Sequence, residues 1–249
     1  MDQRPLPPGK TQAVSSSATL SFAGMQLCAP LENSEPGIAD AGGFGTPVSF
    51  VEIPALKPTQ SAVGYREVCV KFKRLDAAAT QKRRIPVIVG PHGQFYLKDG
   101  HHLALALHLA GRKSVGVTAV ADLSDFSIEA FWRELEERNH VHPFDGNGRR
   151  QPYGRMPSNI LCVDDDIYRS LAGALRRSGG YAKNTAPYAD FAWANFLRRR
   201  IDVPLPTRDF SAALVRARQL AASRAAEHLP GWLAPNTRAE VAPIFAHAS

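Results

Sequence analysis

Residues 90–111 read GPHGQFYLKDGHHLALALHLAG, and this stretch decides the fold around it. Its opening Gly-Pro-His-Gly is a turn signal, because proline presets φ and glycine supplies positive φ. The apolar residues 95–97 follow as a short strand, which residues 99–101 interrupt. Residues 102–110 are strong helix formers and end at Gly111. The stretch therefore predicts a strand connection, a glycine turn and a helix.

Polar groups gather where the predicted strand meets the predicted helix, at Asp99-Gly100-His101-His102. Free backbone N–H groups and the positive end of the helix dipole favour an anion such as phosphate there. A carboxylate beside phosphate either binds Mg²⁺ or accepts a proton from an attacking hydroxyl, and Asp99 is the nearest one. The alternative role for Asp99 is that of a simple N-cap. The adjacent histidines lack the i, i+4 spacing of a zinc pair.

The flanking segments predict a compact α+β core. Alternation of apolar residues predicts a strand over 48–53, and a β-branched run predicts a buried strand over 85–89. A polar loop and a short helix lie between them, where Thr59 is either an N-cap or a phosphate ligand. A further strand is expected over 114–120. A strand, hairpin, helix and strand in this order pack as an α+β unit.

The chain changes to helical patterns after Asp122. Apolar spacing, acidic first turns and Pro or Gly stops predict helices over residues 127–139, 164–177, 187–201 and 209–228, with a Pro/Gly-rich loop at 140–157. We therefore expect three regions: a flexible N-terminal segment over 1–45, the α+β core over 46–125, and a helical C-terminal region packed on that core over 126–249.

Composition limits the class of partner only loosely. The net charge of +7 over 249 residues suits a phosphate-bearing partner, but solvated basic faces explain it equally well. No apolar run approaches the ~20 residues of a membrane span. Three widely spaced cysteines form neither a disulfide framework nor a zinc motif, which favours a reduced, cytoplasmic protein. Residues 11–30 lack charge and leave a secretory or periplasmic signal open against a disordered tail.

Five segments of the chain carry a resemblance to a known family. They are LKPTQSAVGYREVCVK (56–71), IPVIVGPHGQFYLKDGHHLALAL (85–107), FWRELEERN (131–139), DDDIYRSLAGALRRSGGYAK (164–183) and FAWANFLRRR (191–200). In their amino-acid sequences and in their order along the chain they resemble the ParB-like putative nuclease family within the ParB/sulfiredoxin superfamily, over about residues 48–232. The resemblance implies a small mixed sheet with helices and a bacterial-type protein that binds ATP, ADP or CTP with Mg²⁺.

Departures from the superfamily's motifs narrow the implied chemistry. Sulfiredoxins place a catalytic cysteine where this chain has His101, which excludes sulfinic acid reduction by that route. Partition proteins hold the triphosphate with Glu-Arg-Arg, whereas this chain has His101-His102-Leu103. Kinase-like members carry Asp-Gly-His-His-Arg, and here Leu103 replaces the arginine, which puts one phosphate contact in doubt. Those kinases also use a glutamate base, for which Glu67 is the nearest residue by position.

The resemblance and the residues together predict one site. Asp99, Glu67 and His101 are the expected catalytic residues, and Asp99 is the expected Mg²⁺ ligand. The expected binding residues for the nucleotide or phosphorylated small molecule are Thr59, Gln60, Lys71, Gly100 and His102. The expected function is phosphotransfer or nuclease-type phosphoester hydrolysis. The alternative is a non-catalytic partition-like or nucleic-acid-binding module.

Two further motifs compete with this site. His142-Pro-Phe-Asp-Gly-Asn-Gly-Arg149 resembles the Fic adenylyl transferase motif, but it is one residue short before Gly146, and Pro152 interrupts the helix that should receive the phosphate. A surface turn is the alternative. The arginines at 176–177 and 198–200 suit nucleic acid, although arginines at helix C-termini are equally explained by the helix dipole.

Overall fold

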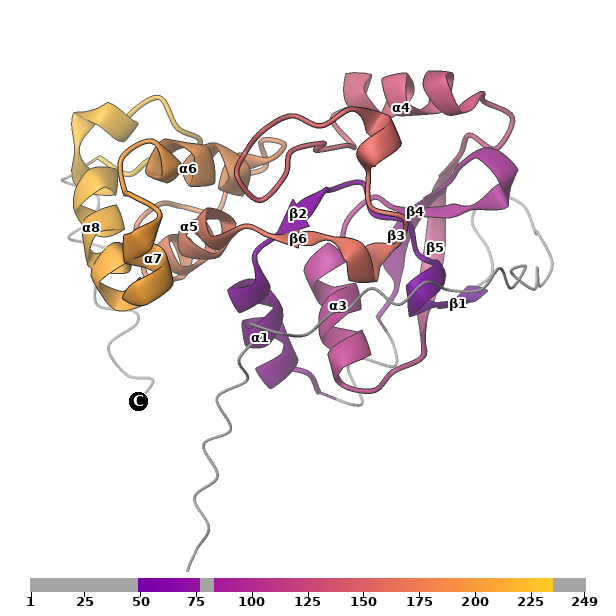
Figure 1. Ribbon diagram of the computed structural model, residues 1–249, viewed down its shortest axis with the longest axis horizontal. Helices are drawn as coiled ribbons and strands as arrows, with labels where there is room; N and C mark the ends of the chain where they lie inside the picture. The colour runs from indigo at the N-terminus through magenta and orange to yellow at the C-terminus, as the bar shows by residue number, and fades with distance from the viewer. Residues whose placement is uncertain (1–48, 77–82, 235–249) are drawn as a thin grey trace, which may run out of the picture.

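The computed structural model describes residues 49–76 and 83–234 (Figure 1). Its main sheet has the strand order β1-β5-β3-β4, with bounds β1 Ser49–Glu52, β3 Ile85–Val89, β4 Phe95–Leu97 and β5 Ser114–Asp122. β5 runs parallel to β3, whereas β1 and β4 lie antiparallel at the two edges. The sheet is therefore small and mixed, which confirms the predicted α+β class.

Helices cover both faces of this sheet (Figure 1). α1 Tyr65–Lys73 and α3 His101–Leu109 lie on one face, where the alternate strand residues Val51, Val87 and Val117 point into the main core. α4 Ile128–Glu137 lies on the other face, and its aromatic residues pack against Ile88 and Tyr96. The predicted strand, turn and helix over 90–111 are all present, with 3₁₀ turn Pro91–Gly93 joining β3 to β4.

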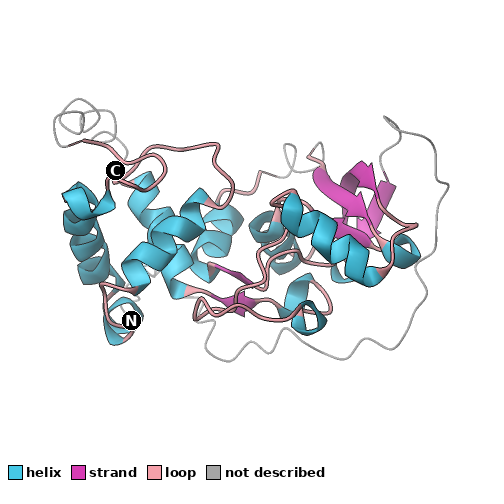
Figure 2. Ribbon diagram, turned by 90° about the horizontal axis from the view of Figure 1, so that it is seen from above, coloured by secondary structure: helices cyan, strands magenta, loops and turns pink. Residues whose placement is uncertain are grey.

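The C-terminal half is helical and has a core of its own around Trp193 and Tyr181. Its helices are α5 Ile167–Arg177, α6 Ala189–Arg198, α7 Pro204–Arg208 and α8 Phe210–Ala222. Figure 2 shows these helices at one end of the molecule and the main sheet at the other. A short parallel pair, β2 Ala62–Val63 with β6 Asp164–Asp165, joins the two halves. The other 3₁₀ turns are Ile53–Ala55, Tyr153–Arg155, Ile160–Cys162 and Arg224–Ala226.

Two glycines allow α5 to lie directly along α1. A Cβ atom on Gly64 would lie 2.7 Å from the backbone nitrogen of Ser170, and one on Gly173 would lie 2.3 Å from the carboxyl carbon of Glu67. The contacts advance in the same direction along both helices, so α1 and α5 run parallel. The close approach needs glycine because any side chain would separate the helices.

Three local predictions were wrong. Thr59 does not cap a helix, since α1 begins at Tyr65 with Gly64 as its N-cap. Asp164 and Asp165 do not start α5, because they pair with β2 and form β6. Asp166 caps α5 instead, accepting hydrogen bonds from the first-turn N–H groups. α8 ends at Ala222, before the expected His228.

Three further expectations concern the N-terminal segment, membrane spans and the cysteines. The N-terminal segment 1–45 lies outside the described residues. Among the helices that the structure describes, none has both the length and the apolar character of a membrane span. Cys69 is a free thiol and Cys162 is disulfide-bonded, so the expectation of a chain without disulfides was wrong for Cys162.

Candidate functional site

The N-terminus of α3 presents unpaired backbone donors. Gly100 is its N-cap with φ of 88°, a conformation that glycine adopts readily. The amides of Leu103 and Ala104 donate to the Gly100 carbonyl, whereas those of His101 and His102 have no acceptor in the part of the chain that the structure describes. Asp99 is not the N-cap; its exposed carboxylate accepts a 2.6 Å hydrogen bond from the Gly100 amide through Oδ1.

A cleft of about 220 Å³ opens at this helix end. Cationic and polar residues line it together with an apolar floor: Lys71, Arg83, Arg84, Asp99, Gly100 and His102, above Ile85, Pro86 and Leu103. Burial lowers the pKa of Lys71, while the negative charge of Asp99 opposes that shift. The Arg84 guanidinium lies against Gly116 and over the Phe50 ring, so Lys71 and Arg83 are the cleft's cationic side chains beside the carboxylate of Asp99.

His102 contributes a neutral hydrogen-bond donor to the cleft. Its Nε2 accepts a 3.2 Å bond from the Gly64 amide, so the neutral ring carries its proton on Nδ1. Burial pushes the pKa of His102 well below its usual value, and the positive charge of Arg169 acts in the same direction. The imidazole therefore stays uncharged, with a donor N–H at Nδ1.

His101 and Thr59 form a buried pair behind the cleft. The Thr59 amide donates to His101 Nε2 at 3.0 Å, and the Thr59 hydroxyl donates to the Leu97 carbonyl at 2.6 Å. His101 is 1% exposed, and burial lowers its pKa to about 4 although Asp99 acts in the opposite direction. Both side chains hold the loop before β2 against the start of α3, and neither lines the cleft.

Glu67 and Gln60 lie outside the cleft as well. Both carboxylate oxygens of Glu67 lie 2.5 Å from Nη1 of Arg177, so the carboxylate forms an ion pair with α5. Gln60 Oε1 is buried and has no hydrogen-bond partner among the described residues. Lys71, Asp99, Gly100 and His102 are therefore the sequence-predicted site residues that the fold brings together in the cleft. The roles assigned to all eight residues stay predictions.

Sequence reasoning missed Arg83 and Arg84 as cleft residues. They belong to the basic run before β3, which reads as a solvated face and connection. Strand β3 begins at Ile85, next to Gly100. A Cβ atom on Gly100 would lie 3.1 Å from Cγ2 of Ile85. This packing carries Arg83 to the helix end, whereas the guanidinium of Arg84 lies against Gly116 and over the Phe50 ring. A basic pair immediately before a buried strand that neighbours the glycine turn was the available signal.

The competing motifs take structural roles. In the Fic-like segment, Asp145 accepts hydrogen bonds from the amides of Asn147 and Arg149 and closes a tight turn. This segment has no helix N-terminus to receive a phosphate, because Pro152 after it is extended and the next element is the 3₁₀ turn Tyr153–Arg155. Three of the five clustered arginines are engaged in ion pairs: Arg176 with Asp190, Arg177 with Glu67, and Arg198 with Asp166.

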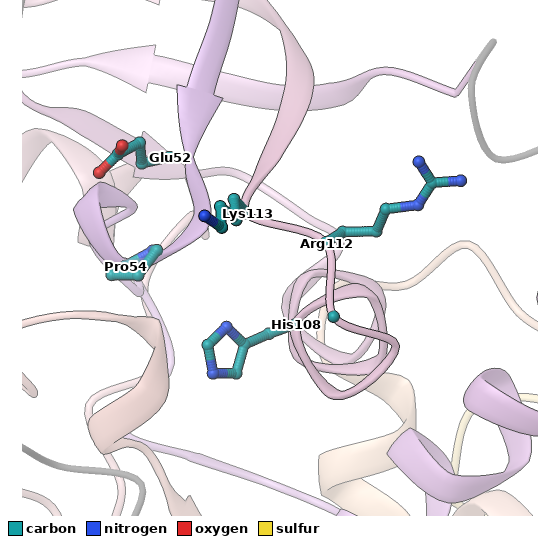
Figure 3. Close-up of a pocket in the computed structure, with 6 residues that line it drawn as sticks. Glu52, Pro54, His108, Arg112 and Lys113 are labelled. Atoms are coloured by element: carbon teal, nitrogen blue, oxygen red, sulfur yellow. The ribbon is translucent and has the colours of Figure 1, made fainter.

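A larger cleft, of about 280 Å³, lies at the opposite end of α3 (Figure 3). Its lining includes Glu52, His108 and Lys113, and Figure 3 shows Arg112 extending away from the other labelled side chains. The C-terminus of a helix carries unpaired carbonyls and a partial negative charge. For a phosphate, the smaller cleft at the N-terminus is therefore the better match.

Comparisons with known proteins agree with the fold and the motif positions. A family model described as "Putative ParB-like nuclease" matches residues 49–199. The crystal structure of protein Atu1540 from Agrobacterium tumefaciens shares 46% identity, covering 76% of this chain and 99% of that one, with a TM-score of 0.72. No curated protein matches the chain.

A weaker match is the C-terminally truncated chromosome-partitioning protein ParB from Caulobacter crescentus, complexed with CTP-gamma-S. It has 13% identity and a TM-score of 0.23, and the match covers 72% of this chain and 94% of that chain. At that TM-score the likeness carries no argument. The family model spans more than half of the described fold, and the Atu1540 structure is similar over nearly its whole length. The chain therefore belongs to the ParB-like nuclease family.

Proposed function

We propose that this protein binds a nucleotide or another phosphate ester with a phosphate group at the N-terminus of α3. One observation carries the proposal: the cleft at the start of α3, into which Lys71 and Arg83 bring positive charge, is lined by His102, whose backbone amide has no acceptor among the described residues. Helix N-termini bind phosphate through such amides, and cationic side chains strengthen that binding. The cleft offers both within one small volume.

The cleft residues take distinct roles in this proposal. Lys71 and Arg83 hold phosphate oxygens, while Nδ1–H of His102 donates a hydrogen bond. Leu103, which stands where kinase-like relatives have arginine, belongs to the apolar floor. Arg83 supplies positive charge from another segment of the chain. The phosphate contact that the replacement put in doubt is thereby made from a different direction.

Asp99 is the residue that acts on the acceptor. Its carboxylate is exposed, and Oδ1 is held by the Gly100 amide, which leaves Oδ2 to face an incoming hydroxyl or water. As a general base, it takes the proton from that group as its oxygen bonds to phosphorus, while the bond from phosphorus to the bridging oxygen breaks and the rest of the ligand leaves with that oxygen. A hydroxyl acceptor gives phosphotransfer, and water gives phosphoester hydrolysis.

The residues present fit Mg²⁺ as a partner of the bound phosphate. No group of three His, Cys, Asp or Glu side chains within the described residues forms a preformed metal site. Mg²⁺ commonly uses one or two carboxylates together with substrate phosphates, so Asp99 would hold it with the ligand. Bound there, the ion would neutralise phosphate charge.

Phosphate binding predicts stabilisation by ligand. We expect ATP, ADP, CTP or orthophosphate, with or without Mg²⁺, to raise the melting temperature, because a ligand at about 100 times its Kd stabilises the native state by about 2.7 kcal/mol. Lys71→Gln should reduce the shift. Lys183→Gln, which removes an exposed lysine of the helical half, is the matched control. If none of the four ligands shifts the melting temperature, the proposed site is wrong.

Asp99→Asn separates catalysis from binding. In a preparation that turns over a nucleotide, we expect the variant to lose a factor of about 100 or more in kcat, because it lacks the base, while it still binds the ligand in the absence of Mg²⁺. Unchanged turnover would contradict the enzymatic role of Asp99. Salt-dependent DNA binding without any nucleotide turnover would instead support the non-catalytic module.

A further inference from the structure

We infer that Cys28 is the disulfide partner of Cys162, and that the bond holds the apolar N-terminal segment 20–31 on a half-buried stripe of α1. This stripe is an interaction surface whose partner is the chain's own N-terminal segment. The inference is independent of the anion cleft, because none of the cleft residues takes part in it.

The assignment of the bond follows from the cysteines of the chain. There are three of them, Cys28, Cys69 and Cys162. Cys162 is disulfide-bonded, whereas Cys69 on α1 is a free thiol. Within one chain, Cys28 is therefore the thiol that remains to pair with Cys162.

The chain between Cys28 and the main sheet is long enough for this bond. About 20 residues separate Cys28 from Ser49, where edge strand β1 begins, and an extended chain of that length spans up to about 65 Å. The amide of Ile160 donates to the carbonyl of Leu56 at 2.9 Å. The 3₁₀ turn that ends at Cys162 therefore lies beside the segment that leaves β1, well within reach of Cys28.

The half-buried stripe of α1 begins beside Cys162. Tyr65, Cys69 and Phe72 follow one another at spacings of four and three residues, so they share one face of the helix. All three are half-buried, and the two aromatic side chains pack on the edge of the main core. The Tyr65 hydroxyl donates to the carbonyl of Val163 at 2.7 Å, and Val163 directly follows Cys162. A segment bonded to Cys162 therefore starts next to this stripe.

The composition of the segment around Cys28 suits this surface. Residues 20–31 read LSFAGMQLCAPL and carry no charged side chain. Burial of their apolar side chains against Tyr65 and Phe72 removes apolar area from water, which favours contact. The disulfide makes this contact intramolecular, so a weak affinity is enough to populate it. The large apolar side chains of the segment are Leu20, Phe22, Met25, Leu27 and Leu31.

The bond forms by exchange with a small-molecule disulfide such as oxidised glutathione. The thiolate of Cys28 attacks one sulfur of that disulfide, and one glutathione thiolate leaves. The thiolate of Cys162 then attacks the sulfur of Cys28 in the mixed disulfide, and the second glutathione thiolate leaves. Two protein thiols are thereby oxidised, one glutathione disulfide is reduced to two thiols, and the protein's thiol protons pass to the released glutathione.

Peptide mapping of the full chain, equilibrated with oxidised glutathione, tests the pairing. Proteolysis without reductant should yield a linked pair of peptides that contain Cys28 and Cys162. Cys28→Ser and Cys162→Ser should each lose this pair and lower the melting temperature by about 10 °C, because the bond closes a long loop. Reduction of the parent should lower it equally. Cys69→Ser is the matched control, and it should keep both the linked pair and the melting temperature of the parent.

Alkylation of Cys69 by iodoacetamide tests where the segment lies, because Cys69 is the middle residue of the stripe. In the native oxidised parent we expect this reaction to be about tenfold slower than in Cys28→Ser, since the segment must first move away. Phe22→Ser, which keeps the disulfide, should also speed the reaction. Phe50→Ser is the matched control, because Phe50 lies on β1 with 64% of its surface exposed, and it should not change the rate. Mass spectrometry of the peptide that contains Cys69 measures the rate.

The two measurements decide the two parts of the inference separately. A linked pair that joins Cys162 to Cys69, or one chain to another, would overturn the pairing with Cys28. If the parent and Cys28→Ser are alkylated at the same rate, the segment does not cover the stripe and the docking part is wrong. Neither measurement involves phosphate, so the proposed function stands or fails independently.

Discussion

Replacing Arg177 with methionine is expected to lower the free energy of unfolding by about 3 kcal/mol, because it leaves a buried carboxylate without its counter-charge. Glu67 is 7% exposed, and Gly173 contacts its carboxylate directly, so water has little access to it. The estimate lies at the lower end of the range for buried pairs because the Arg177 side chain is 31% exposed. Urea unfolding of parent and variant at neutral pH measures the change.

A double-mutant cycle tests whether the loss comes from the ion pair. Glu67→Gln keeps the shape of the side chain and removes the charge, so Arg177→Met in the Glu67→Gln background should cost clearly less than Arg177→Met alone. Equal costs in the two backgrounds would mean that Arg177 stabilises by packing only. Arg218→Met on the exposed face of α8 is the control, and its effect should stay within about 0.5 kcal/mol.

Acid is expected to destabilise the protein from about pH 6.5 downward, through buried histidines. Burial lowers the pKa of His101 to about 4 and that of His142 to about 3, and Arg169 adds to the second shift. Unfolded histidine titrates near 6.5, so the unfolded chain binds more protons below that pH. Stability is therefore complete above about pH 6.5 and falls by about 2 kcal/mol per residue at about pH 5.

His142→Phe should remove part of this acid sensitivity. The imidazole lies flat on the Phe191 ring, with centroids 3.8 Å apart, so phenylalanine can keep the stacking without titrating. We expect the variant to lose less stability than the parent between about pH 7 and 5, as measured by urea unfolding at each pH. His92→Asn alters an exposed histidine at positive φ, which asparagine tolerates, and should leave the pH profile unchanged. If the free energy of unfolding of His142→Phe fell with pH as steeply as that of the parent, this account would be wrong.

The local order of elements was predictable because each carried its own signal. Proline and glycine marked the turn at 90–93, the β-branched run marked β3, and alanine and leucine marked α3. Errors arose where a distant segment decided the outcome. Asp164 and Asp165 have the composition of a helix start, yet they pair with β2 about 100 residues earlier in the chain. No local pattern contains that pairing.

The candidate site likewise contains residues that local sequence predicts and residues that only long-range packing brings in. Asp99, Gly100 and His102 were predictable as neighbours because a turn before a helix brings them together within one short segment. Arg83 reads as a solvated basic residue, because only the pairing of β3 with β4 and the packing of Ile85 against Gly100 carry it to the cleft. Glu67 was placed by position as an acid-base residue, but its partner lies on α5, 110 residues further along the chain.

The sequence by itself determined the family, the α+β class and the position of a helix start at Asp99-Gly100-His101-His102. These features depend on residue type and short spacing, through backbone propensity and the fixed direction of a helix dipole. The tertiary structure alone decided which charges meet there. Ion pairing and burial depend on distances between segments remote in the chain, so the neutral donor of His102, the engagement of Glu67 by Arg177 and the contact of α5 with α1 follow only from packing.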